Sequence, residues 1–205
     1  MWLASATPSL TAELDAREII ASLKRPAPAS MPFTEIRFSA LLEQPLVARG
    51  ELKYLAADHL ERFVADPYKE RTIIRGESVR VERHGEKLRT FSLNRAPELK
   101  GLLLAFSGLL TGEAASVERH FEITAVGNQD RWSLELTPLD ARARKQMQGL
   151  TMIGTSDEPS CLLMHGAGGA HSVMLLGALA DRAIDADTSV ERLENLCKIG
   201  LIGLK

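Results

Sequence analysis

Apolar and polar residues alternate along much of the chain, in runs short enough to be β-strands. The cleanest alternation lies at residues 120–126 and 131–138, which a polar turn at 127–130 joins into a hairpin. Other runs of strand length lie between turns or loops, at residues 35–42, 50–56, 60–65, 70–75, 78–84, 87–93, 150–155, 160–165 and 171–176. Because one apolar and one polar face recur from run to run, we predict an antiparallel sheet that covers an apolar core with one face.

One long helix is predicted in the middle of the chain, at residues 97–110. Its main apolar stripe has helical spacing, at Leu99, Leu102, Leu103, Phe106 and Leu110. Leu104 and Leu109 widen this stripe, so the helix should be covered on more than one side.

Two further helices are predicted nearer the ends of the chain. Residues 11–24 carry apolar side chains at helical spacing, and Pro26 ends that helix. Residues 26–32 are then expected to form a stiff connector into the first strand. Near the C-terminus, Thr188 and Glu191 have the spacing of a capping box, ahead of an apolar stripe of Val190, Leu193 and Cys197.

Length and charge are those of an ordinary folded domain. The 205 residues suffice for one domain with a sizeable core or for two small ones, and we expect one. The 25 Lys and Arg against 27 Asp and Glu leave a net charge of −2, whereas phosphate binding needs concentrated positive charge. No nucleic-acid partner is therefore expected, and no apolar run approaches the length of a membrane-spanning helix.

The first six residues, MWLASA, have two interpretations. They are similar to the end of a secretory signal with an Ala-x-Ala cleavage site, which would make the protein exported, or they are an ordinary N-terminus. We expect residues 1–10 to be a residual signal or a flexible terminus and residues 11–200 to form the domain.

The sequence offers little support for catalysis or for a metal site. It contains no Gly-x-Ser-x-Gly elbow, and we expect no enzyme activity. The glycine-rich loop between His165 and His171 lacks the lysine and hydroxyl of a phosphate-binding loop, so a glycine hairpin is the better interpretation. Cys161, His165 and His171 could approach one another, but a structural zinc site needs a fourth ligand. We expect no metal and no cofactor.

Four segments resemble the LolA-like outer-membrane lipoprotein carriers. Residues 50–67 resemble the family's "G-x-L-x-Y…L…P" segment, residues 33–38 its first long strand, residues 109–112 the end of its central helix, and residues 132–138 its "W-x-L-x-L-x-P" strand. Their order and spacing carry the resemblance, which covers about residues 10 to 165. It implies an α+β fold, in which a single curved antiparallel sheet of about ten strands forms an incomplete β-barrel covered by α-helices.

The resemblance also implies a function. Such carriers hold acyl chains of lipoproteins within the barrel, in the periplasm, and receive them from an inner-membrane transporter for delivery to an outer-membrane acceptor. The expected protein is thus a monomeric lipid-binding chaperone for transport toward the outer membrane. The residues expected to face inward and contact the lipid are Ile36, Phe38, Leu52, Tyr54, Val79, Val81, Leu102, Leu103, Phe106, Leu110, Phe121, Ile123, Trp132, Leu134 and Leu136.

Two features qualify the expected cargo and leave an alternative open. Ala56 and Ala57 stand where the carriers have a basic residue and a proline, which makes a related lipid, such as a polyene or an acyl glycolipid, an alternative to lipoproteins as the cargo. Apolar stripes can equally belong to a filled core, and the protein would then be a non-catalytic scaffold in a lipid export complex of the cell envelope.

Whether the two cysteines of the chain form a disulfide depends on the compartment of the protein. In an oxidising compartment an isolated pair usually bonds, so we predict a disulfide between Cys161 and Cys197; two buried thiols are the alternative.

Overall fold

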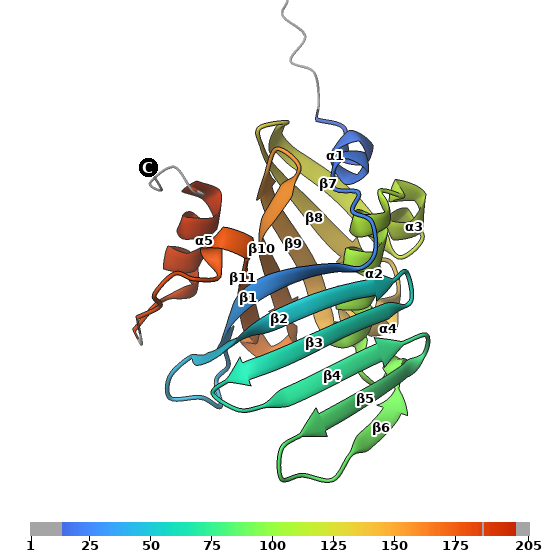
Figure 1. Ribbon diagram of the computed structural model, residues 1–205. Coiled ribbons are helices and arrows are strands. Elements are labelled where there is room, and N and C mark those ends of the chain that lie inside the picture. The colour runs from blue at the N-terminus through green and yellow to red at the C-terminus, as the bar shows by residue number, and fades with distance from the viewer. Residues whose placement is uncertain (1–13, 186, 200–205) are drawn as a thin grey trace, which may run out of the picture.

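The computed structural model describes residues 14–185 and 187–199, and its main feature is one antiparallel sheet of eleven strands (Figure 1). The strands are β1 (Ala29–Phe38), β2 (Leu46–Ala56), β3 (His59–Asp66), β4 (Glu70–Arg75), β5 (Ser78–Arg83), β6 (Arg89–Ser92), β7 (Phe121–Asn128), β8 (Arg131–Pro138), β9 (Met147–Thr155), β10 (Glu158–Gly166) and β11 (His171–Leu176). Their order in space is β6-β5-β4-β3-β2-β1-β11-β10-β9-β8-β7. The sheet curves strongly without closing, so the incomplete barrel predicted from the sequence is confirmed.

The path of the chain explains why a helix crosses the concave face of this sheet. From β1 in the middle, a meander builds one half of the sheet out to β6, and the chain then resumes with β7 at the opposite edge. The connection from β6 to β7 must therefore span the sheet. It does so through a short 3-10 helix η1 (Leu93–Arg95), the helix α2 (Pro97–Thr111) and the helix α3 (Ala114–Glu118).

The other helices divide between the two faces of the sheet. α1 (Ala16–Ser22) packs with α2 and α3, and the short α4 (Ala141–Arg144) lies between β8 and β9. α5 (Val190–Ile199) lies on the outer, convex side, next to β9 and β11 (Figure 1). Two further 3-10 helices, η2 (Ala167–Gly169) and η3 (Gly177–Leu179), flank β11. In the part of the chain that the structure describes, no helix has the length and apolar character needed to cross a membrane.

Each face of the sheet has its own hydrophobic core. The larger core lies between the concave face and α1, α2 and α3, and it includes Phe33, Leu60, Leu134 and Leu136, each at most 1% exposed. The smaller core lies on the convex face and comprises Ile36, Ile153, Cys161, Leu163, Val173, Leu175, Leu179, Leu193 and Cys197. We call them the concave core and the convex core.

The convex core corrects the expected orientation of β1. Ile36 belongs to it and Phe38 packs against it. The prediction that these two residues face the concave side is therefore wrong. Phe33 is the β1 residue in the concave core, and the two-residue period of a strand then places Glu35 and Arg37 on the concave face. An alternating pattern fixes which residues share a face, but not which face a helix will cover.

Two local boundaries also differ from the sequence prediction. Residues 29–32, expected as a connector, are already part of β1, because Pro32 lies where β1 pairs with β2 and has no partner yet in β11. At α5, the Oγ of Ser189 accepts a hydrogen bond from the Arg192 N–H at 3.2 Å, so Ser189 caps this helix in place of Thr188.

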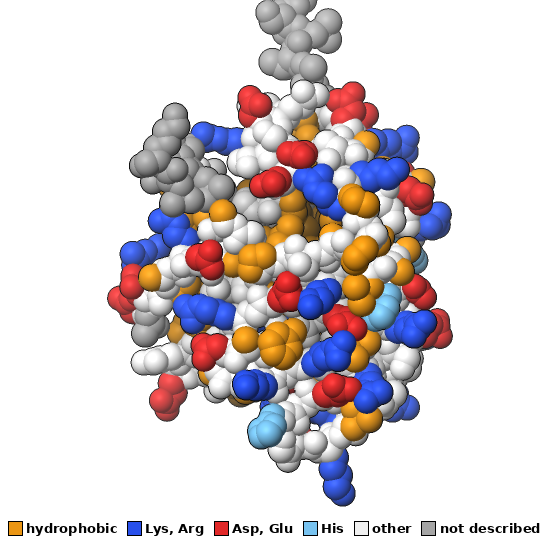
Figure 2. Space-filling view, viewed as in Figure 1, with side chains coloured by type: hydrophobic (Ala, Val, Ile, Leu, Met, Phe, Trp, Pro, Cys, Tyr) orange, Lys and Arg blue, Asp and Glu red, His pale blue; other side chains and the backbone are white. Residues whose placement is uncertain are grey.

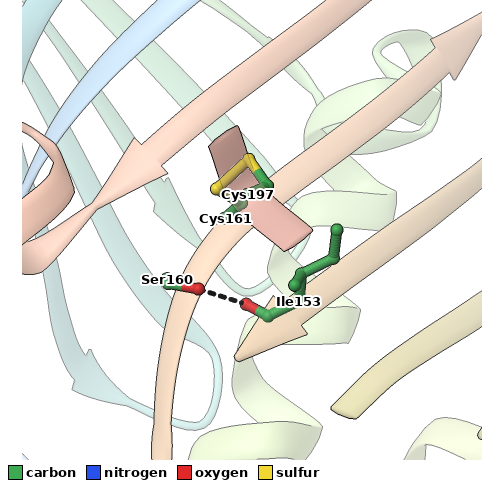
Figure 3. Close-up of a disulfide and its surroundings, with 4 residues drawn as sticks. All are labelled: Ile153, Ser160, Cys161 and Cys197. Carbon is green, nitrogen blue, oxygen red and sulfur yellow. Dashed lines mark hydrogen bonds between the residues drawn. A yellow bond between two sulfur atoms is a disulfide. The ribbon is translucent and has the colours of Figure 1, made fainter. Parts of the chain in front are cut away.

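A disulfide joins the convex core to α5 (Figure 3). Cys161 lies on β10 and Cys197 on α5, with an S–S distance of 2.08 Å, a Cα–Cα distance of 5.8 Å and a sequence separation of 36. Beside it, the Ser160 hydroxyl donates to the Ile153 carbonyl at 3.1 Å. On the chain-entropy model, a loop of this length stabilises the fold by about 4 kcal/mol.

The outer surface of the other half of the sheet is polar. On the face shown in Figure 2, positive and negative side chains are interspersed over β2 to β5. Ion pairs on these strands include Lys53–Glu51 at 3.2 Å and Arg71–Glu61 at 2.9 Å. This part of the convex face is accordingly solvated, whereas α5 covers the part formed by β9, β10 and β11.

Candidate functional site

A cleft of about 440 Å³ opens between the start of α2 and the concave face of the sheet. Its walls come from η1, α2 and six strands on both sides of the sheet centre, namely β1, β3, β4, β5, β10 and β11, with Arg89 of β6 at its edge. The volume lies within the range of roughly 300 to 1,000 Å³ that is common for small-molecule sites. We call this space the α2 cleft.

One side of the α2 cleft is apolar. Its wall includes Val81, Leu99, Leu102, Met164 and Met174. Methionine side chains are unbranched and can adjust to ligands of different shape. This wall suits a hydrocarbon chain.

The other side of the cleft contains a buried carboxylate, Glu35, which is fully buried. It accepts hydrogen bonds from the Arg37 Nε at 2.8 Å, from the Ser172 hydroxyl at 2.7 Å and from the Arg62 guanidinium. Burial by itself would raise the pKa of Glu35, but the nearby charges of Arg62 and Arg37 outweigh it and hold this pKa below its ordinary value. Glu35 is therefore ionised and paired.

Arg62 completes this buried pair but is not fully satisfied itself. Its side chain is 6% exposed, and its guanidinium stacks on the Phe33 ring, 4.8 Å from the ring centre. Its Nε is buried and, among the described atoms, has no acceptor. A buried donor without a partner costs about 1 to 3 kcal/mol, so this nitrogen favours an additional acceptor.

Two more arginines, Arg89 on β6 and Arg95 on η1, line the cleft and are exposed. The remaining carboxylate of the cleft, Glu70, is engaged by Arg83 through contacts of 2.6 and 2.9 Å. No described carboxylate forms an ion pair with Arg89 or Arg95. The cleft thus has an apolar wall and a positively charged mouth.

A second cleft, of about 640 Å³, lies on the other side of the first turns of α2. Lys100, Gly101 and Leu104 of α2 face His120 and Phe121 across it. Burial lowers the pKa of His120, and the neighbouring cations Arg119 and Lys100 lower it further. Both clefts flank the N-terminal half of α2, so this half is the less closely packed part of the helix cover.

The two halves of α2 are held differently. The C-terminal half is fixed by the Leu110 carbonyl, which accepts from the Arg25 N–H at 2.8 Å, and by the Ser107 hydroxyl, which donates to the Ala57 carbonyl. Its Gly108 has no room for a side chain, since an added Cβ would lie 2.3 Å from a Val117 methyl group. The N-terminal half begins at a cap residue without a side-chain hydrogen bond, and the Lys100 ammonium donates to the nearby Asn94 side chain at 2.8 Å.

The structure brings thirteen of the fifteen expected lipid-contacting residues to the concave core, and it places Ile36 and Phe38 on the other face. Of the thirteen, Val81 and Leu102 line the α2 cleft, and Phe121 lines the second cleft. Leu110 and Trp132 border smaller clefts elsewhere. The other eight line none of these clefts and pack into the core; they are Leu52, Tyr54, Val79, Leu103, Phe106, Ile123, Leu134 and Leu136.

Sequence reasoning missed the charged side of the α2 cleft. Glu35 and Arg37 alternate with apolar residues, so the pattern assigned them to the solvated face. Phe33 was the signal that could have revealed this. By the two-residue period it shares a strand face with Glu35 and Arg37, and an apolar Phe33 indicates that this face is covered.

The candidate metal ligands do not form a metal cluster. Cys161 is bonded to Cys197 and has no thiolate to offer a metal. The Nδ1 atoms of His165 and His171 lie 3.3 Å apart at the ends of β10 and β11. No group of three or more His, Cys, Asp or Glu residues that could hold a metal occurs within the described ranges.

Comparison with known proteins gives one family match and several distant structural similarities. Residues 6–200 match the family described as outer membrane lipoprotein carrier protein LolA-like. No curated protein sequence matches the chain.

The structural similarities are weak in sequence. A LolA superfamily protein from Nitrosomonas europaea is 12% identical and aligns with a TM-score of 0.44 over 88% of this chain and 94% of its own. A putative outer membrane lipoprotein-sorting protein domain from Vibrio parahaemolyticus is 8% identical, with a TM-score of 0.42 over 89% of this chain and 97% of its own. Lipoprotein LppX from Mycobacterium tuberculosis is 10% identical, with a TM-score of 0.37 over 84% and 100%.

Proposed function

Because the chain belongs to the family of LolA-like outer membrane lipoprotein carrier proteins, we propose that it carries a lipid within the cell envelope, without catalysing a reaction. The cargo is an acyl or polyene chain, either of a lipoprotein or of a related lipid, and it is bound beneath α2. The compartment is the periplasm, where an oxidising environment supports the Cys161–Cys197 disulfide.

The observation that carries this proposal is the loose packing on both sides of the start of α2. The α2 cleft and the second cleft lie on either side of this half of the helix, whose Leu102 and Leu103 pack into the apolar core. A chain of 16 carbons would gain roughly 12 kcal/mol, before ordering costs, at about 0.8 kcal/mol per buried methylene. That gain is enough to hold a lipid that does not cross water unaided.

Entry and release of the cargo require that the start of α2 move while its end stays in place. The C-terminal half is tied by hydrogen bonds to Arg25 and to Ala57 of the β2–β3 turn. Among the described residues, the N-terminal half is held to the sheet by packing, with Gly101 against the flexible Met147 side chain. The donor is an inner-membrane transporter and the acceptor an outer-membrane protein, as the family resemblance implies. The protein acts as a monomer.

A second candidate function is a scaffold with a filled core. It is favoured by the burial of Leu134 and Leu136, which are 0% and 1% exposed and line none of the clefts. A filled core would leave the protein without cargo, and its role would then be to hold other envelope proteins together.

Binding of an uncharged fluorescent acyl probe, together with mass spectrometry of lipids extracted from the purified protein, distinguishes the two functions. For the carrier we expect probe binding that Leu99→Asp weakens at least tenfold, because Leu99 lines the α2 cleft and is only partly buried. The matched control is Leu41→Asp, on a residue that is 94% exposed and should leave binding unchanged. A wild-type protein that binds no probe and holds no lipid would establish the scaffold instead.

A further inference from the structure

The positive charges of the α2 cleft come from four separate elements of the fold. Arg37 lies on β1, Arg62 on β3, Arg89 on β6 and Arg95 on η1, and all four line the cleft together with Glu35 and Glu70. Among the described side chains of the cleft there are thus two more positive than negative charges. Residues so far apart in sequence meet only because the sheet is curved and the chain returns across it.

The two carboxylates are already neutralised within the protein. Glu35 is held by Arg37 and Arg62, and Glu70 by Arg83. Arg89 and Arg95 are the cations left over, since neither has an ion-pair partner among the described residues. They lie on consecutive elements at the edge of the cleft.

Arg62 provides a second and independent indication that a ligand with acceptor atoms belongs here. Its side chain is only 6% exposed, and its buried Nε has no acceptor among the atoms that the structure describes. A ligand oxygen in the cleft would be a partner for this nitrogen. The apolar wall of the same cleft, with Leu99, Leu102 and Met174, would take the rest of the ligand.

We infer that the cargo is an amphiphile with an anionic head group, a carboxylate or a phosphomonoester, which Arg89 and Arg95 bind at the mouth of the α2 cleft while its chain lies under α2. This inference rests on the proposed carrier function and specifies its cargo. Guanidinium groups match the paired oxygens of carboxylates and phosphates better than lysine does. A zwitterionic or cationic head group would find no free carboxylate among the described residues of the cleft.

The test compares ligands with one chain and different heads. Palmitate, hexadecyl phosphate and methyl palmitate would each displace the uncharged fluorescent probe, at concentrations at which they remain monomeric. We expect the two anions to displace it at concentrations at least tenfold lower than the ester. The preference should shrink in 1 M salt, because ions screen exposed charges.

Variants of the arginines test which residues bind the head group. The double variant Arg89→Glu with Arg95→Glu should lose the preference for palmitate over its methyl ester and should still bind the ester. The control is Arg75→Glu, which makes the same charge reversal once, at an exposed residue of β4 that lines none of the clefts. The control should keep the preference of the wild type.

The outcomes separate this inference from the proposed function. If the wild type binds palmitate and its methyl ester equally, or if the double variant keeps the preference, the head-group site is refuted and the carrier function stands. Displacement of palmitate by millimolar acetate or inorganic phosphate would show a simple anion site and refute an amphiphile. If no ligand binds at all, the carrier function and this inference are both refuted.

Discussion

The two faces of the sheet are covered by helices in different ways. On the convex face, α5 covers a small apolar core, and the Cys161–Cys197 disulfide fixes it covalently. On the concave face, α2 is fixed over its second half and flanked by clefts over its first half, and a buried Glu35–Arg62 pair lies beside it. For the proposed carrier, the convex cover would hold the sheet in shape and the concave cover would admit the ligand.

The largest effect is expected from a charge in the packed part of the concave core. Leu134→Glu would bury an unpaired carboxylate at a residue that is 0% exposed, and we expect a loss of about 5 kcal/mol in the free energy of unfolding. Denaturant unfolding measures this loss. Leu41→Glu, on the exposed β1–β2 loop, is the control and should change little. A stable Leu134→Glu protein would mean that the concave core is hollow there as well.

The second-largest loss of stability is expected from removing the disulfide that holds the convex cover. Cys161→Ser combined with Cys197→Ser is expected to cost about 4 kcal/mol, from the loop that the bond closes. Binding of the uncharged acyl probe by the fraction that remains folded should not change. A loss of binding at full folding would contradict the division of roles between the two faces.

The buried pair should make the concave side sensitive to acid. The pKa of Glu35 is lowered in the folded protein, so its contribution is present above the unfolded pKa of about 4.3 and is lost as the pH falls through the folded value. Glu35→Gln leaves buried Arg62 with only the more distant Glu70 carboxylate, 3.9 Å away, and should cost about 3 kcal/mol at neutral pH.

Measuring the free energy of unfolding over a range of pH provides the control for Glu35→Gln. Unfolding of wild type and Glu35→Gln should be compared between pH 7 and pH 3, and the difference between them should narrow at the acid end. An unchanged difference would show that Glu35 is not the group that titrates.

The smallest effect is expected at the exposed pair between α1 and α3. Arg17 Nε lies 2.8 Å from Glu118 Oε1, with the arginine side chain 69% exposed. Pairs in such surroundings contribute little, so Arg17→Ala should leave thermal unfolding unchanged within error. A clear drop in the melting temperature would reveal that α1 is a needed part of the concave cover.

Much of the fold followed from local patterns in the sequence. Alternation located the strands, and the spacing from Leu99 to Leu110 located α2 with its buried Phe106, which is 4% exposed. Local patterns do not determine whether a set of alternating residues lies on the concave or the convex face of the sheet. Ile36 and Phe38 alternate as cleanly as residues of the concave core, and only the position of α5 decides that they lie on the convex side.

The candidate site was less accessible to sequence reasoning than the fold. Glu35, Arg62, Arg89 and Arg95 are scattered over more than fifty residues, and each one alone is typical of a solvated strand face or turn. Their proximity depends on the order of the strands and on the curvature of the sheet. Charges that meet through tertiary structure leave no spacing by which a motif could be recognised.

The connection between the edge strands sets an upper limit on what the barrel can hold. β6 and β7 are the free edges of the sheet, and the chain between them consists mainly of α2, whose 15 residues span about 22 Å at 1.5 Å per residue. The edges cannot separate further than this segment reaches unless its helices unwind. In the proposed carrier, the girth of the cargo would therefore be limited by the length of a covalent segment.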